Sequence, residues 1–474
     1  MKQSKIIALL ASFPPASLQA FRRHLSSPVH NENQDLIKLF DILIQEVIPS
    51  PEKIIDKKQV WESLYNTIPF QDQTLRRLNS ELTRHAFTFL AIQTFERNPF
   101  WKAEAILPNL LDPGLHKHFK GVLRNVELLE EKDPSQSPLS FFRRHKIEHL
   151  RHRQLEASGQ KPDTLAFLEG ADHHLDCFYF VQKLKNQCDA LSYQNTLALK
   201  AEMEQIPGLL QYLEQSPFVE VPLIRAYLLA LKMLLNPDDE TAFHSLRALL
   251  QTQGEQLDKK EQHTLFIHLM NYCIDTRINK GRTDFFGELF QLYQVALDQE
   301  IILEEGMLDP FHYKNIITVG LRLEAFEWTE RFIQKFTQRL PEAHQANALT
   351  YNLAKVYFQK EEYEKVIEQL REVEYQDVVY ALGAKLMLLK TYFEVKDFLP
   401  MDSLADSFRI FLFRNKRISK EVKQQYLNVL RFTKKLSHIQ PGDAKALKKV
   451  REQVAGCKAL ADKQWILEKI EELS

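Results

Sequence analysis

The sequence predicts an all-α protein in which a helical N-terminal region is followed by an α-solenoid of antiparallel helix pairs. Three observations lead to this prediction. Glycine accounts for only 13 of the 474 residues, which leaves few positions for hairpin turns or phosphate-binding loops. Apolar residues recur at the helical spacing i, i+3, i+4 and i+7 along nearly every segment. Helical segments also come in pairs at spacings of roughly 30 to 45 residues, which is typical of a solenoid.

Two polar breaks suggest how the chain is organised. The stretch from Glu130 to Pro138 contains no apolar residue, and a second break lies at Ser158-Gly159-Gln160-Lys161-Pro162. Beyond about residue 216, the helix pairs continue until a basic segment begins. We therefore expect four regions, which are an N-terminal helical region (1–135), a helical connector (136–215), a helix-pair solenoid (216–415) and a basic C-terminal helical cap (416–474).

The N-terminal region contains several amphipathic segments. Residues 17–25 and 35–47 have apolar residues at helical spacing, and Pro49 and Pro51 are expected to end the second helix. Residues 73–95 form the longest such pattern, and we expect Asp72 to be its N-cap, because a carboxylate there accepts from the first free backbone N–H groups. The region is thus expected to be helical.

The C-terminal half contains internal similarity. Leu353-Ala354-Lys355-Val356-Tyr357-Phe358 recurs 35 residues later as Leu388-Leu389-Lys390-Thr391-Tyr392-Phe393, and Gly320 matches Ala354 at an offset of 34. A small residue at that position lets two helices approach closely. Short turns at 236–239, 280–284 and 340–342 separate the helices further upstream.

These residues resemble the tetratricopeptide repeat family, with residues 347–374 similar to one full repeat and the best match over about 310–415. Val366 and Met401 stand where the family prefers alanine, and Pro400 is expected to delay the start of one second helix. The resemblance implies a concave surface that binds a partner. The side chains it places there are Tyr351, Lys355, Phe358, Lys390 and Phe393.

The resemblance also bears on the kind of partner. Family members that hold a C-terminal carboxylate use asparagine where Lys355 and Lys390 stand. A surface of lysines and aromatic rings instead suits an extended acidic or amphipathic peptide. The alternative is that these lysines are only solvated. We therefore expect a non-enzymatic scaffold that binds a protein or peptide.

Common catalytic patterns are missing. The sequence has no P-loop, no dinucleotide-binding glycine pattern, no G-x-S-x-G and no H-E-x-x-H, so we expect neither an enzyme nor a cofactor. One pattern keeps a remote metallopeptidase hypothesis open: His145, Glu148 and His149 have the spacing of an inverted zinc-protease motif. Arginines and lysines surround it, which favours a solvated basic helix.

A basic stretch lies near the C-terminus. Residues 409–451 contain thirteen Lys or Arg and two acids, a net charge of +11 within a chain of net charge −1. It is either a solvated end of the solenoid, a site for an acidic protein, or a nucleic-acid site. The residues of the predicted basic patch are Arg414, Lys416, Arg417, Lys420, Lys423, Lys434 and Lys435.

A second segment leaves nucleic acid possible, although not favoured. Residues 60–85 have the rhythm of a helix-turn-helix, with Arg76, Arg77 and Arg84 available for phosphates. Ordinary three-helix packing accounts for the same pattern, and no β-wing pattern follows it.

The compartment and membrane relation follow from composition. Four cysteines without a C-x-x-C pair suggest a reduced, cytoplasmic setting. Ile6 to Ala11 are similar to a short signal-peptide core, but Pro14 and Pro15 and a further amphipathic helix follow directly. No run of 18 apolar residues is present, so no membrane span is expected.

Overall fold

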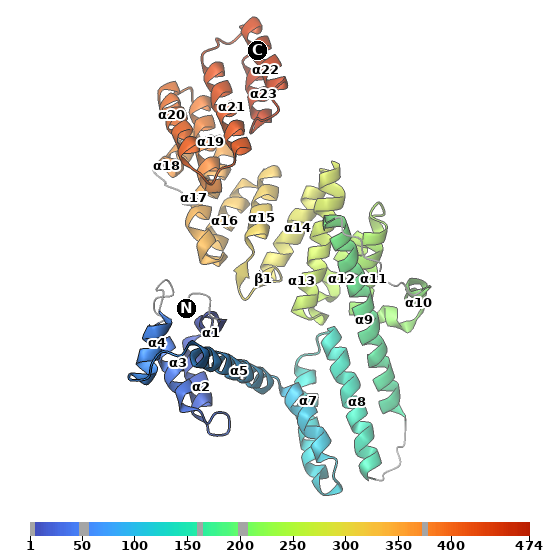
Figure 1. Cartoon of the computed structure of the whole chain (residues 1–474). Coiled ribbons are helices and arrows are strands. Elements are labelled where there is room, and N and C mark those ends of the chain that lie inside the picture. Colours follow the sequence, from blue (N-terminus) through green and yellow to red (C-terminus); the bar gives the residue numbers. More distant parts are fainter. Residues whose placement is uncertain (1–4, 47–55, 159–164, 198–206, 372–377) are drawn as a thin grey trace. The chain divides into compact units, whose positions relative to one another are not determined.

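The computed structural model describes residues 5–46, 56–158, 165–197, 207–371 and 378–474 (Figure 1). It is 81% helical, with twenty-three α-helices and a single short β-hairpin in these ranges. The predicted all-α class is confirmed. The expected stops at Pro49 and Pro51 and the break at Gly159 to Pro162 lie outside the described residues. No helix within the described ranges has the length and apolar character needed to cross a bilayer.

The chain divides into two compact units, residues 1–179 and 180–474. The division falls within helix α9, Ala166–Leu197. The finer division at residues 135, 215 and 415 stays a prediction.

The first unit begins with a bundle of five helices, which are α1 (Lys5–Ala11), α2 (Pro15–Ser26), α3 (Gln34–Glu46), α4 (Lys57–Tyr65) and α5 (Asp72–Arg97). Their apolar faces share one core around Phe21, Leu39 and Leu82, which are fully buried. The N-cap prediction for Asp72 is wrong, since Gln71 is the N-cap. Asp72 lies in the first turn, where its carboxylate pairs with Arg76 and Lys57 at 2.7 and 2.8 Å.

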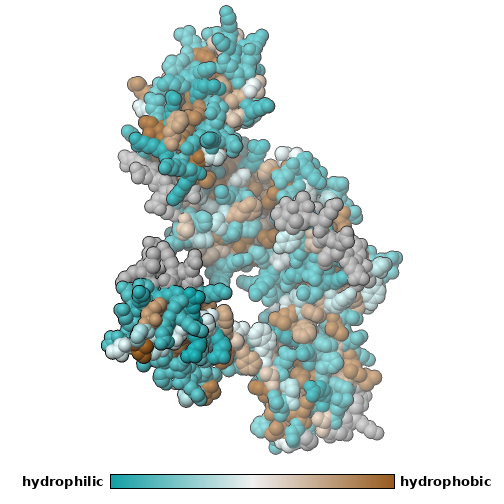
Figure 2. All heavy atoms as spheres, viewed as in Figure 1, coloured by the Kyte–Doolittle hydropathy of each residue, from teal (hydrophilic) through white to brown (hydrophobic). Residues whose placement is uncertain are grey.

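The rest of the first unit consists of α6 (Pro99–Ile106), α7 (His116–Lys132), α8 (Pro138–Ser158) and the start of α9, with 3₁₀ turns at Leu107–Leu110 and Pro113–Leu115. Helix α7 continues to Lys132, so the connection to α8 is shorter than the polar stretch from Glu130 suggested. Hydrophobic side chains gather on the face of α7 and α8 seen in Figure 2. Leu128 of α7 and Leu139 of α8 are exposed side chains of these helices.

The second unit consists of the end of α9 and fourteen further helices within the described residues. In chain order these are α10 (Leu209–Gln215), α11 (Pro222–Leu235), α12 (Thr241–Gln253), α13 (Lys259–Asn271), α14 (Phe285–Asp298), α15 (Pro310–Arg322), α16 (Phe326–Phe336), α17 (Glu342–Gln359), α18 (Tyr363–Leu370), α19 (Val378–Glu394), α20 (Phe398–Arg414), α21 (Lys420–Ser437), α22 (Ala444–Ala455) and α23 (Lys463–Glu472). Short 3₁₀ turns lie at Pro217–Glu220, Gly254–Gln256, Ile278–Lys280 and Thr337–Arg339, and a π-helical turn at Tyr272–Arg277.

One feature of this unit departs from simple helix pairs. Strands β1 (Leu303–Glu304) and β2 (Met307–Leu308) form an antiparallel hairpin between α14 and α15. Glu305 and Gly306 take positive φ at its turn, at 51° and 80°. This hairpin was not predicted, because two-residue strands are too short to show an alternating pattern.

From α11 to α21, each helix packs against the next one in the chain, and α15, α17 and α19 also contact one another in succession. The close approach expected at Gly320 is confirmed, since a Cβ atom there would lie 2.2 Å from the Thr329 hydroxyl of α16. Such contacts agree with paired helices; the solenoid itself stays a prediction.

The prediction for Pro400 is wrong. Helix α20 begins at Phe398 and contains Pro400 in its first turn. Proline is tolerated there because the first N–H groups of a helix have no intrahelical acceptor. Val366 and Met401, which replace the small residues of the repeat pattern, are fully buried.

Candidate binding cleft in the basic C-terminal region

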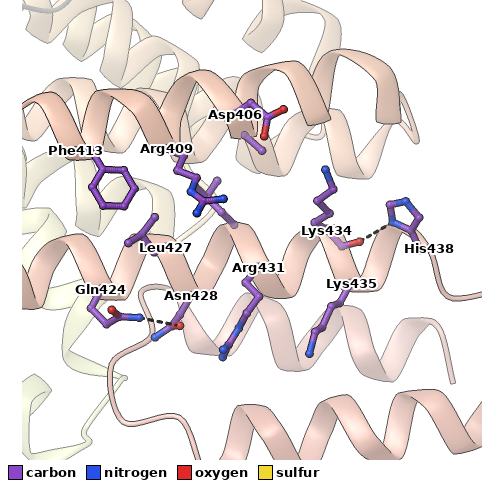
Figure 3. A pocket seen from close by; sticks show the side chains of 12 residues that line it. Asp406, Arg409, Phe413, Gln424, Leu427, Asn428, Arg431, Lys434, Lys435 and His438 are labelled. Carbon is purple, nitrogen blue, oxygen red and sulfur yellow. Dashed lines mark hydrogen bonds between the residues drawn. The ribbon is translucent and has the colours of Figure 1, made fainter.

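A cleft of about 700 Å³ lies between α20 and α21 (Figure 3). Two helices that follow one another in the chain form its walls, and their side chains reach it at helical spacing. From α20 come Ala405, Asp406, Arg409 and Phe413, and from α21 come Gln424, Leu427, Asn428, Leu430, Arg431, Lys434, Lys435 and His438. We refer to it as the basic cleft.

Aromatic packing holds the two walls together. Phe408 of α20 and Phe432 of α21 are fully buried, and the rings of Phe408 and Tyr426 lie 5.6 Å apart. Ser419 caps α21, because its hydroxyl accepts from the backbone N–H of Val422. The cleft therefore lies on a fixed part of the fold.

Cations outnumber acids in the basic cleft. The lining contains four cations, Arg409, Arg431, Lys434 and Lys435, and a single carboxylate, that of Asp406. Arg409 has no ion-pair partner among the described residues, whereas the nearby Lys434 and Arg451 each have one. The cleft therefore presents unneutralised positive charge to solvent.

The other three cations make only weak, solvent-exposed contacts. The Arg431 guanidinium lies 4.6 Å above the Phe432 ring. Lys434 Nζ lies 3.3 Å from an Asp402 carboxylate oxygen, and Lys435 Nζ donates to the Gln453 side chain at 2.7 Å. Half-exposed pairs of this kind contribute little to stability, so an anion could compete for these groups.

The floor of the basic cleft is apolar, and one wall carries an exposed ring. Ala405 and Leu430 are buried, each 7% exposed, whereas Phe413 is 60% exposed. Asn428 is fixed, since its amide donates to the Ala459 carbonyl at 2.7 Å and accepts from Gln424 at 3.2 Å. An occupant would thus meet an apolar floor between charged edges.

The predicted basic patch is divided by the structure. Lys434 and Lys435 line the basic cleft. The other five, Arg414, Lys416, Arg417, Lys420 and Lys423, lie at the end of α20, in the turn and in the first turn of α21, outside the lining. Arg409 and Arg431 belong to the predicted stretch 409–451 but were not chosen. The signal that could have found them is helical spacing. Arg409 lies four residues from both Ala405 and Phe413, and Arg431 lies four residues from Leu427 and three from Lys434, so each arginine shares one helix face with other lining residues.

The residues predicted from the repeat resemblance lie on α17 and α19. The Tyr351 ring packs closely against Gly383 of α19. A Cβ atom at Gly383 would lie 2.4 Å from the Tyr351 hydroxyl oxygen. Lys355 Nζ lies 5.7 Å above the Tyr351 ring, and burial, with a smaller effect of Lys314, lowers the pKa of Lys355. Phe358 is half-buried beneath Lys390, whose Nζ lies 4.8 Å from its ring centre.

The expectation that all five residues line one open surface is wrong for Lys390 and Phe393. Lys390 Nζ forms an ion pair with Asp462 at 2.7 Å, and its side chain is 15% exposed. Phe393 is 8% exposed and meets the Trp465 ring edge-on at 5.5 Å. Helix α23 and the residue before it cover this place, so a partner does not have free access to it.

The H-x-x-E-H residues lie on α8. His145 Nδ1 donates to the Ala171 carbonyl at 2.8 Å, and Glu148 pairs with Arg151 at 2.5 Å. Burial, together with the neighbouring His145, His152 and Lys146, lowers the pKa of His149. Within the ranges that the structure describes, no group of three or more His, Cys, Asp or Glu is placed to hold a metal ion.

The helix-turn-helix-like segment corresponds to α4 and the first half of α5. Leu75, Leu78 and Leu82 point into the bundle core. Arg76 pairs with Asp72 at 2.7 Å and Arg84 lies 3.8 Å from Glu81. Nucleic-acid binding by this segment stays a prediction.

A polar cluster that sequence reasoning missed lies inside the second unit. Glu261 accepts from Lys185 Nζ at 2.9 Å and from the Tyr227 hydroxyl at 2.5 Å. His268 Nδ1 lies 3.2 Å from the Ser192 hydroxyl. Burial, with a smaller effect of Lys185, lowers the pKa of His268 to about 4. These contacts join α9 to α11 and α13.

Comparison with known proteins finds no matching family model, no similar curated protein and no similar solved structure.

Proposed function

We propose that the chain is a non-enzymatic protein-binding scaffold whose basic cleft holds an acidic helical segment of a partner protein. The observation that carries this proposal is the composition of the cleft, in which four cations and one acid surround an apolar floor. Positive edges attract and orient an acidic partner, while apolar contact supplies affinity.

The dimensions of the cleft suit a helix. Its longer wall runs along α21 from Gln424 to His438, a distance of about 21 Å at the helical rise per residue. A partner helix of about four turns would match this wall. Helix-in-groove recognition places apolar residues at i, i+3, i+4 and i+7 in the groove, and acids beside that row would reach Arg409 and Arg431.

A direct test uses a labelled amphipathic peptide of about 16 residues, with leucines on one face and glutamates beside them. Its binding to the full chain is followed by fluorescence anisotropy. We expect Arg409→Glu with Arg431→Glu to weaken binding at least about tenfold, because like charges then face each other across the interface with the peptide.

The matched control is Lys448→Glu with Lys449→Glu. Both lysines are exposed on α22, outside the cleft lining, and the change in net charge is the same. We expect this control to weaken binding less than about threefold, since charges outside the cleft act on the peptide only across salt-containing solvent, which screens them. Equal losses in both variants would mean that net charge alone attracts the peptide, and the proposal would be abandoned.

Duplex DNA serves as a competitor in the same assay. We expect it to displace the peptide only at low ionic strength, because phosphate contacts weaken steeply with added salt. Displacement by DNA that persists at physiological salt would favour the nucleic-acid hypothesis instead.

A further inference from the structure

A second cleft, of about 600 Å³, lies in the middle of the second unit between α14 and α16. These helices flank α15 in the chain (Figure 1), and Gln251 near the end of α12 completes the lining. We refer to it as the Trp328 groove. Its chemistry differs from that of the basic cleft, because aromatic rings form one wall and amides the other.

The aromatic wall is a row on α16. Trp328 and Phe332 are four residues apart, with ring centres 5.5 Å apart and planes within 4° of parallel. Phe336 continues the row at 5.1 Å from Phe332. Phe332 and Phe336 are buried, and Trp328 is half-buried with Phe290 packed against it at 4.7 Å. The indole is thus a rigid surface at the mouth of the groove.

The opposite wall carries Gln291 and Gln294 of α14 beside Gln251. In the described part of the chain, none of these three amides has a hydrogen-bond partner, and neither has the Trp328 indole N–H. Each amide offers two donors and one acceptor, and the indole offers one donor. Gln251, Gln291, Gln294 and Trp328 therefore bring free hydrogen-bonding capacity to the groove lining. An extended backbone, which has no internal hydrogen bonds, offers the complementary N–H and C=O groups.

A helix is a poor match for the same groove. Its backbone groups are already paired internally, so the three amides would meet only side chains. The α16 wall of the groove from Trp328 to Phe336 spans about 12 Å at the helical rise per residue, and Trp328 is the most exposed of its three rings. About four residues of polyproline II chain cover that distance, and aromatic surfaces with nearby polar groups are the usual receptors for such segments.

Charge further restricts the occupant. Arg331 and Lys335 of α16 line the groove with Asp298 of α14. Neither cation has an ion-pair partner among the described residues. The Lys335 Nζ atom lies 5.2 Å above the Phe336 ring. We propose that the Trp328 groove binds an extended, proline-containing segment of a partner protein that carries an acidic residue beside the prolines. This site is independent of the basic cleft.

The test uses the full chain and a labelled peptide of about twelve residues with a Pro-x-x-Pro core and two flanking glutamates. Anisotropy is measured for the wild type, for Trp328→Ala and for Trp328→Phe. We expect Trp328→Ala to weaken binding at least about tenfold, as for a tryptophan at the centre of an interface. Trp328→Phe, which keeps a ring and loses the indole N–H, is expected to have an intermediate affinity.

Two controls show whether a loss of binding arises in the Trp328 groove itself. Trp101→Ala removes a 42% exposed tryptophan in the first unit and is expected to leave the affinity unchanged. The acidic amphipathic peptide should still bind Trp328→Ala at the basic cleft, which would show that the variant is folded. If that peptide does not bind the wild type either, far-UV circular dichroism is used to show that the variant is folded. Unchanged binding by Trp328→Ala, equal binding of a peptide with alanine for each proline, or no binding by the wild type would each overturn the proposal.

Discussion

At the scale of single residues, the contact between Gly320 and Thr329 shows how closely α15 and α16 approach. A Cβ atom at position 320 would meet the Thr329 hydroxyl at 2.2 Å, and that hydroxyl donates to the Ala325 carbonyl at 2.8 Å. Overpacking a well-filled contact typically costs about 1–3 kcal/mol. We therefore expect Gly320→Ala to lower the free energy of unfolding by that amount, measured by urea denaturation.

A helical glycine without such a neighbour provides the control. Gly287 of α14 has no atom within 4 Å of its ideal Cβ position, so Gly287→Ala should stabilise the chain by up to about 1 kcal/mol. Adding Thr329→Ala to Gly320→Ala should recover most of the loss. If Gly320→Ala behaves like Gly287→Ala, the close approach is not present.

We expect His268 to make the stability of the second unit sensitive to acid. The imidazole is 4% exposed, and burial with the nearby Lys185 lowers its pKa in the folded chain from 6.5 to about 4. Between these values the unfolded chain binds a proton that the folded chain does not. Stability from this group is therefore complete above pH 6.5 and is lost as the pH falls toward 4.

The expected loss between pH 7 and pH 5 is about 2 kcal/mol from His268 alone. Hydrogen–deuterium exchange of α13 measures the local free energy of opening at both pH values. His268→Gln should show a smaller difference between them, whereas His344→Gln, at an exposed position, should behave as the wild type. A pH dependence that His268→Gln leaves unchanged would show that other groups cause it.

At the scale of secondary-structure elements, α23 packs onto α19 through a buried tryptophan and an ion pair. The Trp465 ring is 5% exposed and packs on Phe393, while its indole N–H donates to Glu394 at 2.9 Å. Lys469 pairs with the same carboxylate at 2.9 Å, with both side chains nearly buried. A short C-terminal helix therefore contributes to the core of α19 and α20.

We expect Trp465→Ala to lower the free energy of unfolding by about 3–5 kcal/mol, as for other large-to-small changes in a core. Urea denaturation followed by far-UV circular dichroism measures it. Trp101→Ala, at an exposed position in the first unit, should change stability by less than about 1 kcal/mol. A small effect at Trp465 would indicate that α23 is only loosely attached, and Lys390 and Phe393 would then be open to a partner.

The sequence predicted helices well and their ends less well. Amphipathic spacing is a local signal, so the segments at 17–25, 35–47 and 73–95 were recognised. The exact ends of a helix depend on which nearby side chain pairs with which group. Asp72 was expected to cap α5, but ion pairs with Arg76 and Lys57 hold it in the first turn, and Pro400 fits the first turn of α20.

The site was predicted in part. A count of charges found the basic stretch, and two of its chosen residues, Lys434 and Lys435, do line the cleft. Arg409 and Phe413 were not predicted to line a cleft, because the lining depends on how α20 and α21 face each other and the sequence does not show this. The covering of Lys390 by Asp462 joins positions 72 residues apart, and no local pattern reports such a contact.

At the scale of the whole molecule, the net charge of −1 conceals strong segregation. A segment of net charge +11 lies between residues 409 and 451, and part of it forms the basic cleft. The Trp328 groove lies elsewhere in the second unit, on α14 and α16. Two clefts with different chemistry on one chain would suit the proposed scaffold, because surface residues and not the fold decide the partner.

The most direct test of the central claim is a charge exchange across the basic cleft, measured by isothermal titration calorimetry. Arg409→Glu with Arg431→Glu is titrated with the acidic amphipathic peptide and with a version carrying lysine in place of each glutamate. We predict that the variant loses the acidic peptide and binds the lysine peptide at least about tenfold more tightly than the wild type does. If the variant binds the acidic peptide as the wild type does, the basic cleft is not the binding site.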